Sequence, residues 1–256
     1  MEKIYFINSL GLRLAGIFHS PTEHTRSIII MVHGFSSDKD SLGRFVRAAE
    51  EFCKAGIAVF RFDFSGFGES DQTEISIQQQ VDDLRSAIYF VKQSGYTEIG
   101  LLGLSLGGLC AILAYEEDIK TLILWAPVTN KKKLNIMVER WIEHEIQTKG
   151  YLLVKDNETG REYKVSKNIL IENRTINQQQ ILSKIICPVL IIHGTRDSII
   201  PLEYSLSAMQ YLPKDSKLEI IDGEDHRLMK KFNLVIDASL HWLKNYLYDT
   251  EARMSD

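Results

Sequence analysis

The chain has 256 residues, enough for one large domain or for a core domain that carries an insertion. Its hydrophobic content of 45% and charged content of 25% are ordinary for a soluble globular protein. A formal net charge of −4 leaves no basic surplus to attract nucleic acid, and no apolar stretch reaches the length of a membrane span.

The first half of the chain alternates strands with helices. Residues 3–19 are typical of a hairpin, and the continuous apolar run at 27–33 is typical of a strand covered on both faces. The following pattern predicts a helix at 41–53, a strand at 57–62, a helix at 77–93, a strand beginning at Ile99, a helix reaching Tyr115 and a strand at 121–125. Such alternation with short turns predicts a mostly parallel sheet with helices on both faces.

The alternation breaks after Pro127. The pattern there predicts an amphipathic helix at 131–147, an exposed hairpin with strands at 151–154 and 161–165, and one or two helical pieces before Ile186. We interpret residues 128–185 as an inserted lid on a core domain made of residues 1–127 and 186–256. Trp141 and Tyr151 are candidates for lining the substrate pocket, with packing inside the lid as the alternative.

The alternation resumes at Pro188. A strand is predicted at 188–193, a helix at 202–211, a final strand at 217–222 and a terminal helix at 234–248. The sheet therefore continues beyond the inserted segment, so that residues at both ends of the chain contribute to one core.

A Gly-x-Ser-x-Gly motif spans residues 103–107, with Ser105 at its centre. An apolar strand precedes the motif and an apolar helix follows it, so the serine stands on a sharp turn that exposes its hydroxyl at the edge of the sheet. The helix that begins at this turn directs its positive end toward any negative charge that develops there. Without this context the motif would indicate no more than a glycine-rich turn.

An acid and a base follow downstream in the order that such a serine requires. Asp197 and His226 each come just after a predicted strand, and catalytic groups in open α/β sheets gather at the carboxyl ends of strands. We therefore predict that Ser105, Asp197 and His226 form a catalytic triad. The alternative for His226 is a surface histidine, and the competing acids are other aspartates: Asp118, Asp222 and Asp225.

A tetrahedral oxyanion needs hydrogen-bond donors. The backbone N–H of Leu106, next to Ser105, is one candidate, and that of Phe35, in the loop after the first buried strand, is the other. The neighbouring His33, like His193 at a later strand end, is interpreted as a structural residue.

These motifs together resemble the α/β-hydrolase superfamily over nearly the whole chain. The residues that carry the resemblance are His33-Gly34-Phe35, Asp63 to Ser70, Gly103 to Gly107, Gly194 to Asp197 and Gly223 to His226. Within the superfamily the chain is most similar to small bacterial esterases of the cinnamoyl/feruloyl type and to the serine aminopeptidase-like and monoacylglycerol lipase-like group. The resemblance implies an eight-stranded sheet in which only the second strand is antiparallel, a modest lid after the sixth strand, and hydrolysis through an acyl-enzyme.

We therefore expect a serine esterase that acts on small-molecule esters of small to medium acyl groups, including aryl and hydroxycinnamoyl groups. A peptidase, an amidase or a thioesterase of the same fold is the alternative, and a non-catalytic small-molecule-binding protein is a weaker one. No cofactor or metal is expected: His144-Glu145 starts a zinc motif, but Thr148 stands where its second histidine would be.

Three cysteines at distant positions and the absence of a signal-peptide pattern predict a reduced, cytoplasmic protein. Neither nucleic acid nor a membrane is an expected partner. A homodimer is left possible.

Overall fold

The computed structural model describes residues 1–131, 136–156 and 160–247. Eight strands form one sheet in the order β1-β2-β4-β3-β5-β6-β9-β10. Their bounds are β1 Glu2–Ile7, β2 Arg13–His19, β3 Ser27–Val32, β4 Ala58–Phe62, β5 Glu98–Leu104, β6 Ile119–Trp125, β9 Val189–Gly194 and β10 Lys217–Ile221. Only β2 runs in the direction opposite to that of the other strands in this sheet. The predicted α/β-hydrolase fold is confirmed.

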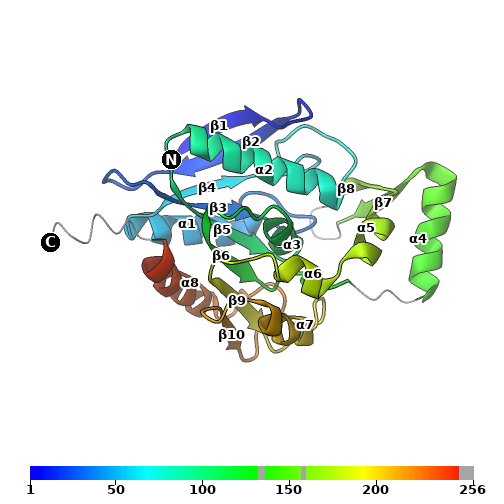
Figure 1. The fold of residues 1–256 in the computed structure, drawn as a ribbon. Coiled ribbons are helices and arrows are strands. Elements are labelled where there is room, and N and C mark those ends of the chain that lie inside the picture. Colours follow the sequence, from blue (N-terminus) through cyan, green and yellow to red (C-terminus); the bar gives the residue numbers. More distant parts are fainter. Residues whose placement is uncertain (132–135, 157–159, 248–256) are drawn as a thin grey trace.

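Helices cover both faces of this sheet (Figure 1). One face is packed by α1, Arg44–Lys54, and α8, Phe232–Tyr246. The other is packed by α2, Ile77–Gln93, α3, Leu106–Leu113, and α7, Leu202–Ala208, which a 3-10 turn at Met209–Tyr211 extends. The two faces produce two separate apolar cores, because the side chains of each strand alternate between them.

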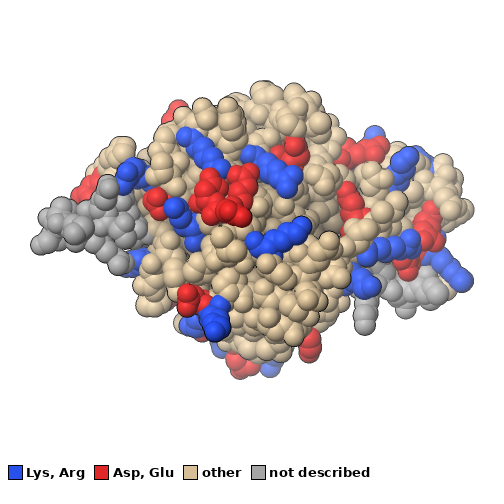
Figure 2. All heavy atoms as spheres, viewed as in Figure 1, with Lys and Arg blue, Asp and Glu red and all other residues tan. Residues whose placement is uncertain are grey.

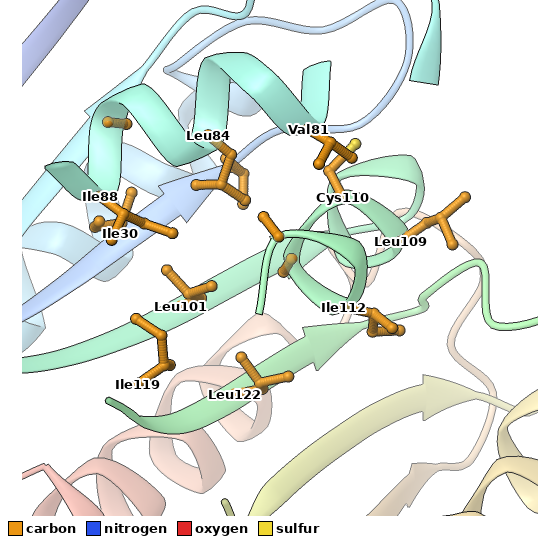
Figure 3. Close-up of a cluster of buried hydrophobic side chains, with 14 of the residues drawn as sticks. Ile30, Val81, Leu84, Ile88, Leu101, Leu109, Cys110, Ile112, Ile119 and Leu122 are labelled. Atoms are coloured by element: carbon orange, nitrogen blue, oxygen red, sulfur yellow. The ribbon is translucent and has the colours of Figure 1, made fainter. Parts of the chain in front are cut away.

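Figure 3 shows the part of the core beneath α2 and α3. Ile30 projects from β3 toward the apolar side of α2 that Val81, Leu84 and Ile88 form, whereas Leu122 on β6 lies beneath Ile112 of α3. The three α2 residues recur at the spacing of an amphipathic helix, as the sequence predicts. The strand side chains are fully buried, so the sheet gives the loops at its carboxyl edge a rigid support.

The segment between β6 and β9 has its own elements and projects from one end of the sheet (Figure 1). They are α4, Ile136–Lys149, β7, Tyr151–Lys155, β8, Glu162–Ser166, α5, Ile169–Thr175, and α6, Gln178–Leu182. A small apolar cluster of Ile142, Leu152, Val165 and Leu170 joins the first four of them. Leu182 and Ile185, by contrast, pack in the main core. Residues 132–135 of the predicted helix, residues 157–159 of the hairpin turn and residue 248 of the terminal helix lie outside the described residues.

Two connections bind this projecting segment to the chain just before α2. The backbone N–H of Ile75 donates to the carbonyl of Lys164 at 2.8 Å, and that of Ser166 donates to the carbonyl of Ile75 at 2.9 Å. The carboxylate of Glu172 accepts from the backbone N–H of Ile77 at 2.9 Å, at the N-terminus of α2, where a negative charge is favoured. The segment is thus attached beside the carboxyl edge of the sheet.

The first helix begins later than the sequence predicts. Residues 41–53 were expected to be helical, but α1 starts at Arg44. Ser41, Leu42 and Gly43 all have positive φ values, of 48°, 56° and 81°, and form a tight left-handed turn. Only glycine adopts positive φ values without strain. Ser41 and Leu42 are not glycine, so the sequence does not indicate a left-handed turn there.

Acidic and basic side chains are interspersed on the face of the molecule in Figure 2, with no broad area of one sign over its described residues. Within the described ranges, no helix is both long enough and apolar enough to cross a membrane.

A buried histidine on β2 makes stability depend on pH. His19 accepts a hydrogen bond at Nε2 from Nε–H of Arg61, with the two nitrogens 2.8 Å apart. Burial, and then the positive charge of Arg61, lowers the pKa of His19 to about 4. Protonation of Nε2 would remove the acceptor and place two cations side by side.

We expect the free energy of unfolding to fall as the pH drops from 6.5, the ordinary histidine value, toward about 4. In this window the unfolded chain binds a proton at His19 and the folded chain does not, so acid favours unfolding. The expected loss by pH 5 is about 1–2 kcal/mol once solvent screening is allowed for. Urea titrations at pH 7 and pH 5 measure it. His19→Gln should reduce the loss, while His24→Gln, in an exposed loop, should keep it; equal losses in both variants would contradict the assignment.

Candidate active site

Ser105 stands between β5 and α3 with φ 56° and ψ −116°, a conformation that L residues rarely adopt. Its surroundings hold it there. Its backbone N–H donates to the carbonyl of Trp125 at 2.9 Å, and its own carbonyl accepts from Gly108 at 3.0 Å and from Val128 at 3.1 Å. Strain maintained by several neighbours is a recurring property of functional sites.

Two glycines allow α3 to approach the sheet closely enough to form this turn. A Cβ added at Gly103 would lie 2.5 Å from the carbonyl oxygen of Gly107, and one added at Gly107 would lie 2.4 Å from the carbonyl oxygen of Val32. Both neighbours are backbone atoms, which cannot rotate away. The glycines of the motif are therefore required by contact between α3 and the strands.

Gly107→Ala is expected to destabilise the protein by about 3 kcal/mol or more, because the new methyl group overlaps the backbone of β3. The free energy of unfolding in urea measures the effect. Gly95→Ala is the matched control, since its φ is +94° but nothing lies within 4 Å of the added Cβ. That variant should cost only about 1 kcal/mol. Equal costs would show that close approach is not what requires Gly107.

The structure brings Ser105, His226 and Asp197 into one hydrogen-bonded chain. Nε2 of His226 lies 3.0 Å from Oγ of Ser105, and Nδ1 of His226 lies 2.7 Å from Oδ2 of Asp197. A carboxylate can only accept, so Nδ1 carries the proton and Nε2 is left to accept from the serine hydroxyl. The imidazole is thus oriented as a base toward Ser105.

Asp197 is fully buried and is surrounded by donors. Its Oδ1 accepts from the backbone N–H groups of Ile199 and Ile200, both at 2.8 Å. Burial raises the pKa of Asp197, but hydrogen bonds from His193 and His226 outweigh it and hold the pKa well below the usual range. This carboxylate therefore stays ionised at any pH at which the protein would work.

His193 also contacts the acid, although the sequence analysis gave it only a structural role. Its Nε2 lies 3.1 Å from Oδ2 of Asp197 and 3.0 Å from the carbonyl oxygen of Ile200, while Nδ1 lies 2.7 Å from Oγ of Ser205. A carbonyl can only accept, so Nε2–H donates and Nδ1 accepts from Ser205. The sequence carries no clear signal for this contact, because His193 lies on β9 and Asp197 in the turn that follows, where a four-residue spacing does not fix proximity as it does in a helix.

Both candidate oxyanion donors lie on segments next to Ser105. Leu106 is the first residue of α3, where a backbone N–H has no partner within the helix. A Cβ added at Gly34 would lie 3.2 Å from Cβ of Ser105, so the loop that carries Phe35 passes directly beside Ser105. The N–H of Phe35 donates to no acceptor among the described residues.

His33 is structural, as predicted. It is buried, its Nδ1 donates to the carbonyl of Gly34 at 2.8 Å, and its Nε2 accepts from the backbone N–H of Phe64 at 3.1 Å. Burial lowers its pKa and keeps the ring neutral. These bonds fix the loop that carries Phe35.

A cavity of about 780 Å³ opens over Ser105 and His226. Its walls are mainly apolar and come both from the sheet side and from the projecting segment, including Phe35, Ile77, Leu109, Val128, Ile142, Leu152, Tyr163, Val165 and Leu170. Across the described residues, no cluster of three or more His, Cys, Asp or Glu side chains could hold a metal ion. The arrangement can activate a serine next to an apolar binding site.

The two predicted pocket residues do not line this cavity. Trp141 is 52% exposed on the outside of α4, and the ring of Tyr151 lies 5.1 Å from Nζ of Lys164. The residues that follow each of them, Ile142 and Leu152, line the cavity instead. The prediction was wrong by one position in both elements, because one step along a helix or a strand changes the face.

A family model described as Serine aminopeptidase, S33 matches residues 23–169. The mitochondrial palmitoyl-protein thioesterase ABHD10 of Rattus norvegicus is 30% identical over 210 residues, which cover 78% of this chain and 69% of that protein. A putative esterase/lipase of Mycoplasma genitalium is 25% identical, over 82% of this chain and 86% of its own.

Among solved structures, the α/β hydrolase GrgF of Penicillium sp. sh18 superposes with a TM-score of 0.82 at 20% identity, over 96% of this chain and 98% of that one. Est1E of Butyrivibrio proteoclasticus, solved with ferulic acid, gives 0.77 at 24% identity, over 95% and 98%. Likeness at these identities concerns the fold. Together with the match to the family model, it establishes that the chain belongs to the serine aminopeptidase S33 family of α/β hydrolases.

Proposed function

We propose that this hydrolase is a serine esterase that cleaves carboxylic esters of small to medium acyl groups, aryl groups included, through Ser105, His226 and Asp197. The observation that carries the proposal is the continuous hydrogen-bonded chain from Asp197 through His226 to Ser105. The apolar cavity above this chain supports an acyl substrate. Residues 128–185 act as a lid, since they contribute one wall of that cavity.

In the mechanism, His226 takes the proton of the Ser105 hydroxyl as the oxygen attacks the carbonyl carbon of the ester. The N–H groups of Phe35 and Leu106 stabilise the oxyanion of the tetrahedral intermediate. His226 then gives its proton to the leaving alcohol, and the acyl group remains on Ser105. In the second half, His226 activates a water molecule that releases the acid. Asp197 holds the imidazole and stabilises its charged form.

Thioester hydrolysis is the second candidate. The rat relative at 30% identity is named as a palmitoyl-protein thioesterase, and a thiohydrolase of Aspergillus aculeatus is 31% identical over 50% of this chain. A thiolate leaves without needing a full proton from His226, so the same residues are sufficient for it. Peptide or anilide hydrolysis demands stronger protonation of the leaving nitrogen and is less favoured.

Two measurements test the proposal. A fluorophosphonate should add once to the native protein, and intact mass followed by peptide mapping should place the adduct on Ser105. A lack of labelling under conditions that label a control esterase would refute a serine hydrolase. Matched ester, thioester and anilide substrates with one acyl group then compare kcat/KM, and a higher value for the thioester would favour the second candidate.

A further inference from the structure

Two arginines line the cavity that the candidate base also lines. They are Arg44, the first residue of α1, and Arg227, the residue after His226. Arg44 is only 6% exposed. The N-terminal end of α1 adds its partial positive charge at the same place.

The guanidinium of Arg44 has neutral partners. Its Nε–H donates to the carbonyl of Ser41 at 2.9 Å, one terminal nitrogen donates to the carbonyl of Arg227 at 2.7 Å, and the other donates to Oγ of Ser41 at 3.0 Å. These bonds use three of the five N–H groups of a guanidinium. Among the described residues, no carboxylate lies within 4.0 Å of it.

Asp225 is the acidic group that acts on Arg44 from a greater distance, and it is paired with Lys230 at 3.7 Å. Burial, followed by the charge of Arg227, lowers the pKa of Arg44 to about 10, so the side chain stays charged at neutral pH. Burying a cation without an acidic partner is costly unless another group compensates it.

Arg44 and Arg227 line the same cavity as His226. His226 must give a proton to the leaving group, so the leaving group has to lie next to this imidazole. Arg227 follows His226 in the chain, and Arg44 is hydrogen-bonded to its carbonyl. The other charged residues that line the cavity are of both signs, and Arg161 among them is paired with Asp38 at 3.8 Å.

We propose that the cavity binds esters or thioesters whose leaving group carries an anion, a carboxylate or a phosphate, and that Arg44 is the residue that binds this anion. The acyl group occupies the apolar part of the cavity. This inference rests on the proposed hydrolase function and adds the chemistry of the leaving group to it.

Arg44 also holds together the left-handed turn at Ser41 and the loop that carries His226. A purely structural role would affect all substrates equally, whereas an anion site affects only the charged ones. The test therefore uses a ratio of two activities. The two substrates are the hexanoyl esters of 4-hydroxybenzoate and of 4-hydroxybenzamide, which differ in charge but hardly in size.

The wild-type protein should hydrolyse the benzoate ester with a kcat/KM about 10- to 100-fold above that of the benzamide ester, as expected for a charge-assisted hydrogen bond. Arg44→Gln should bring the ratio close to one, and Arg44→Lys should keep part of it. Arg47→Gln is the control, because Arg47 lies on the same helix but does not line the cavity, and its ratio should stay at the wild-type value. The ester of 4-hydroxyphenylphosphonate, assayed alongside, distinguishes a phosphate-like anion from a carboxylate.

A wild-type ratio near one, or a fall of both activities by the same factor in Arg44→Gln, would overturn the anion site. Failure to hydrolyse either ester or to react with a fluorophosphonate would instead refute the proposed function. If Arg44→Gln does not fold, competitive inhibition of the wild-type protein is measured instead, with the benzamide ester as substrate. The inhibition constant of benzoate should be at least about 10-fold lower than that of benzamide. Equal inhibition constants would reject the proposal.

Discussion

Replacing Ser105 with alanine is expected to lower kcat/KM for ester hydrolysis by about 10⁴- to 10⁶-fold. The hydroxyl is the atom that would form the acyl-enzyme, and no other described side chain occupies its place beside Nε2 of His226. Activity on a chromogenic ester, followed with enough protein to detect the residual rate, measures the effect.

The fold should survive this change, because the bonds that hold residue 105 in its strained conformation involve backbone atoms. Its thermal midpoint should therefore stay within about 2 °C of the wild-type value. Ser94→Ala, at the exposed end of α2, is the matched control and should retain full activity. If Ser105→Ala retained more than about a tenth of the activity, another nucleophile would have to replace the serine.

The core fold and the proximity of the three candidate site residues could be predicted from local signals. The central strands β3 and β9 are mainly apolar, as burial on both faces demands, whereas the edge strand β10 has Lys217 and Glu219 among its apolar residues. Ser105, Asp197 and His226 each follow a parallel strand, and the carboxyl ends of parallel strands meet at one edge of a sheet. Their convergence therefore follows from chain order and strand direction, without any knowledge of the individual contacts.

The cavity could not be predicted in the same way. Whether Trp141 or Ile142 faces inward depends on how α4 is rotated in the lid, and tertiary packing decides that rotation. The burial of Arg44 depends on the left-handed turn before α1, where Ser41 and Leu42 adopt positive φ without being glycine. The local sequence predicts a helix that already begins at residue 41, and nothing in it indicates this turn.

Asp197→Asn is expected to lower kcat for ester hydrolysis about 10³- to 10⁴-fold. Four nitrogens surround this carboxylate: the backbone N–H groups of Ile199 and Ile200 donate to Oδ1, and His226 donates to Oδ2, which also lies 3.1 Å from Nε2 of His193. An asparagine has one acceptor oxygen and cannot satisfy both pairs. If its oxygen faces the histidines, its NH₂ group opposes two backbone donors. If its NH₂ group faces them, His226 must accept at Nδ1 and carry its proton at Nε2, where it can no longer act as the base.

Both orientations also leave buried donors unsatisfied, so Asp197→Asn should destabilise the protein by about 1–3 kcal/mol as well as inactivate it. Steady-state kinetics and urea unfolding measure the two effects separately. Asp222→Asn is the matched control, because Asp222 precedes His226 by four residues and accepts instead from Oγ1 of Thr195 at 3.0 Å. It should keep near wild-type activity. A histidine base needs one carboxylate to fix its tautomer, and the two aspartates cannot both supply it. If Asp197→Asn were active and Asp222→Asn inactive, the acid would be Asp222 and not Asp197.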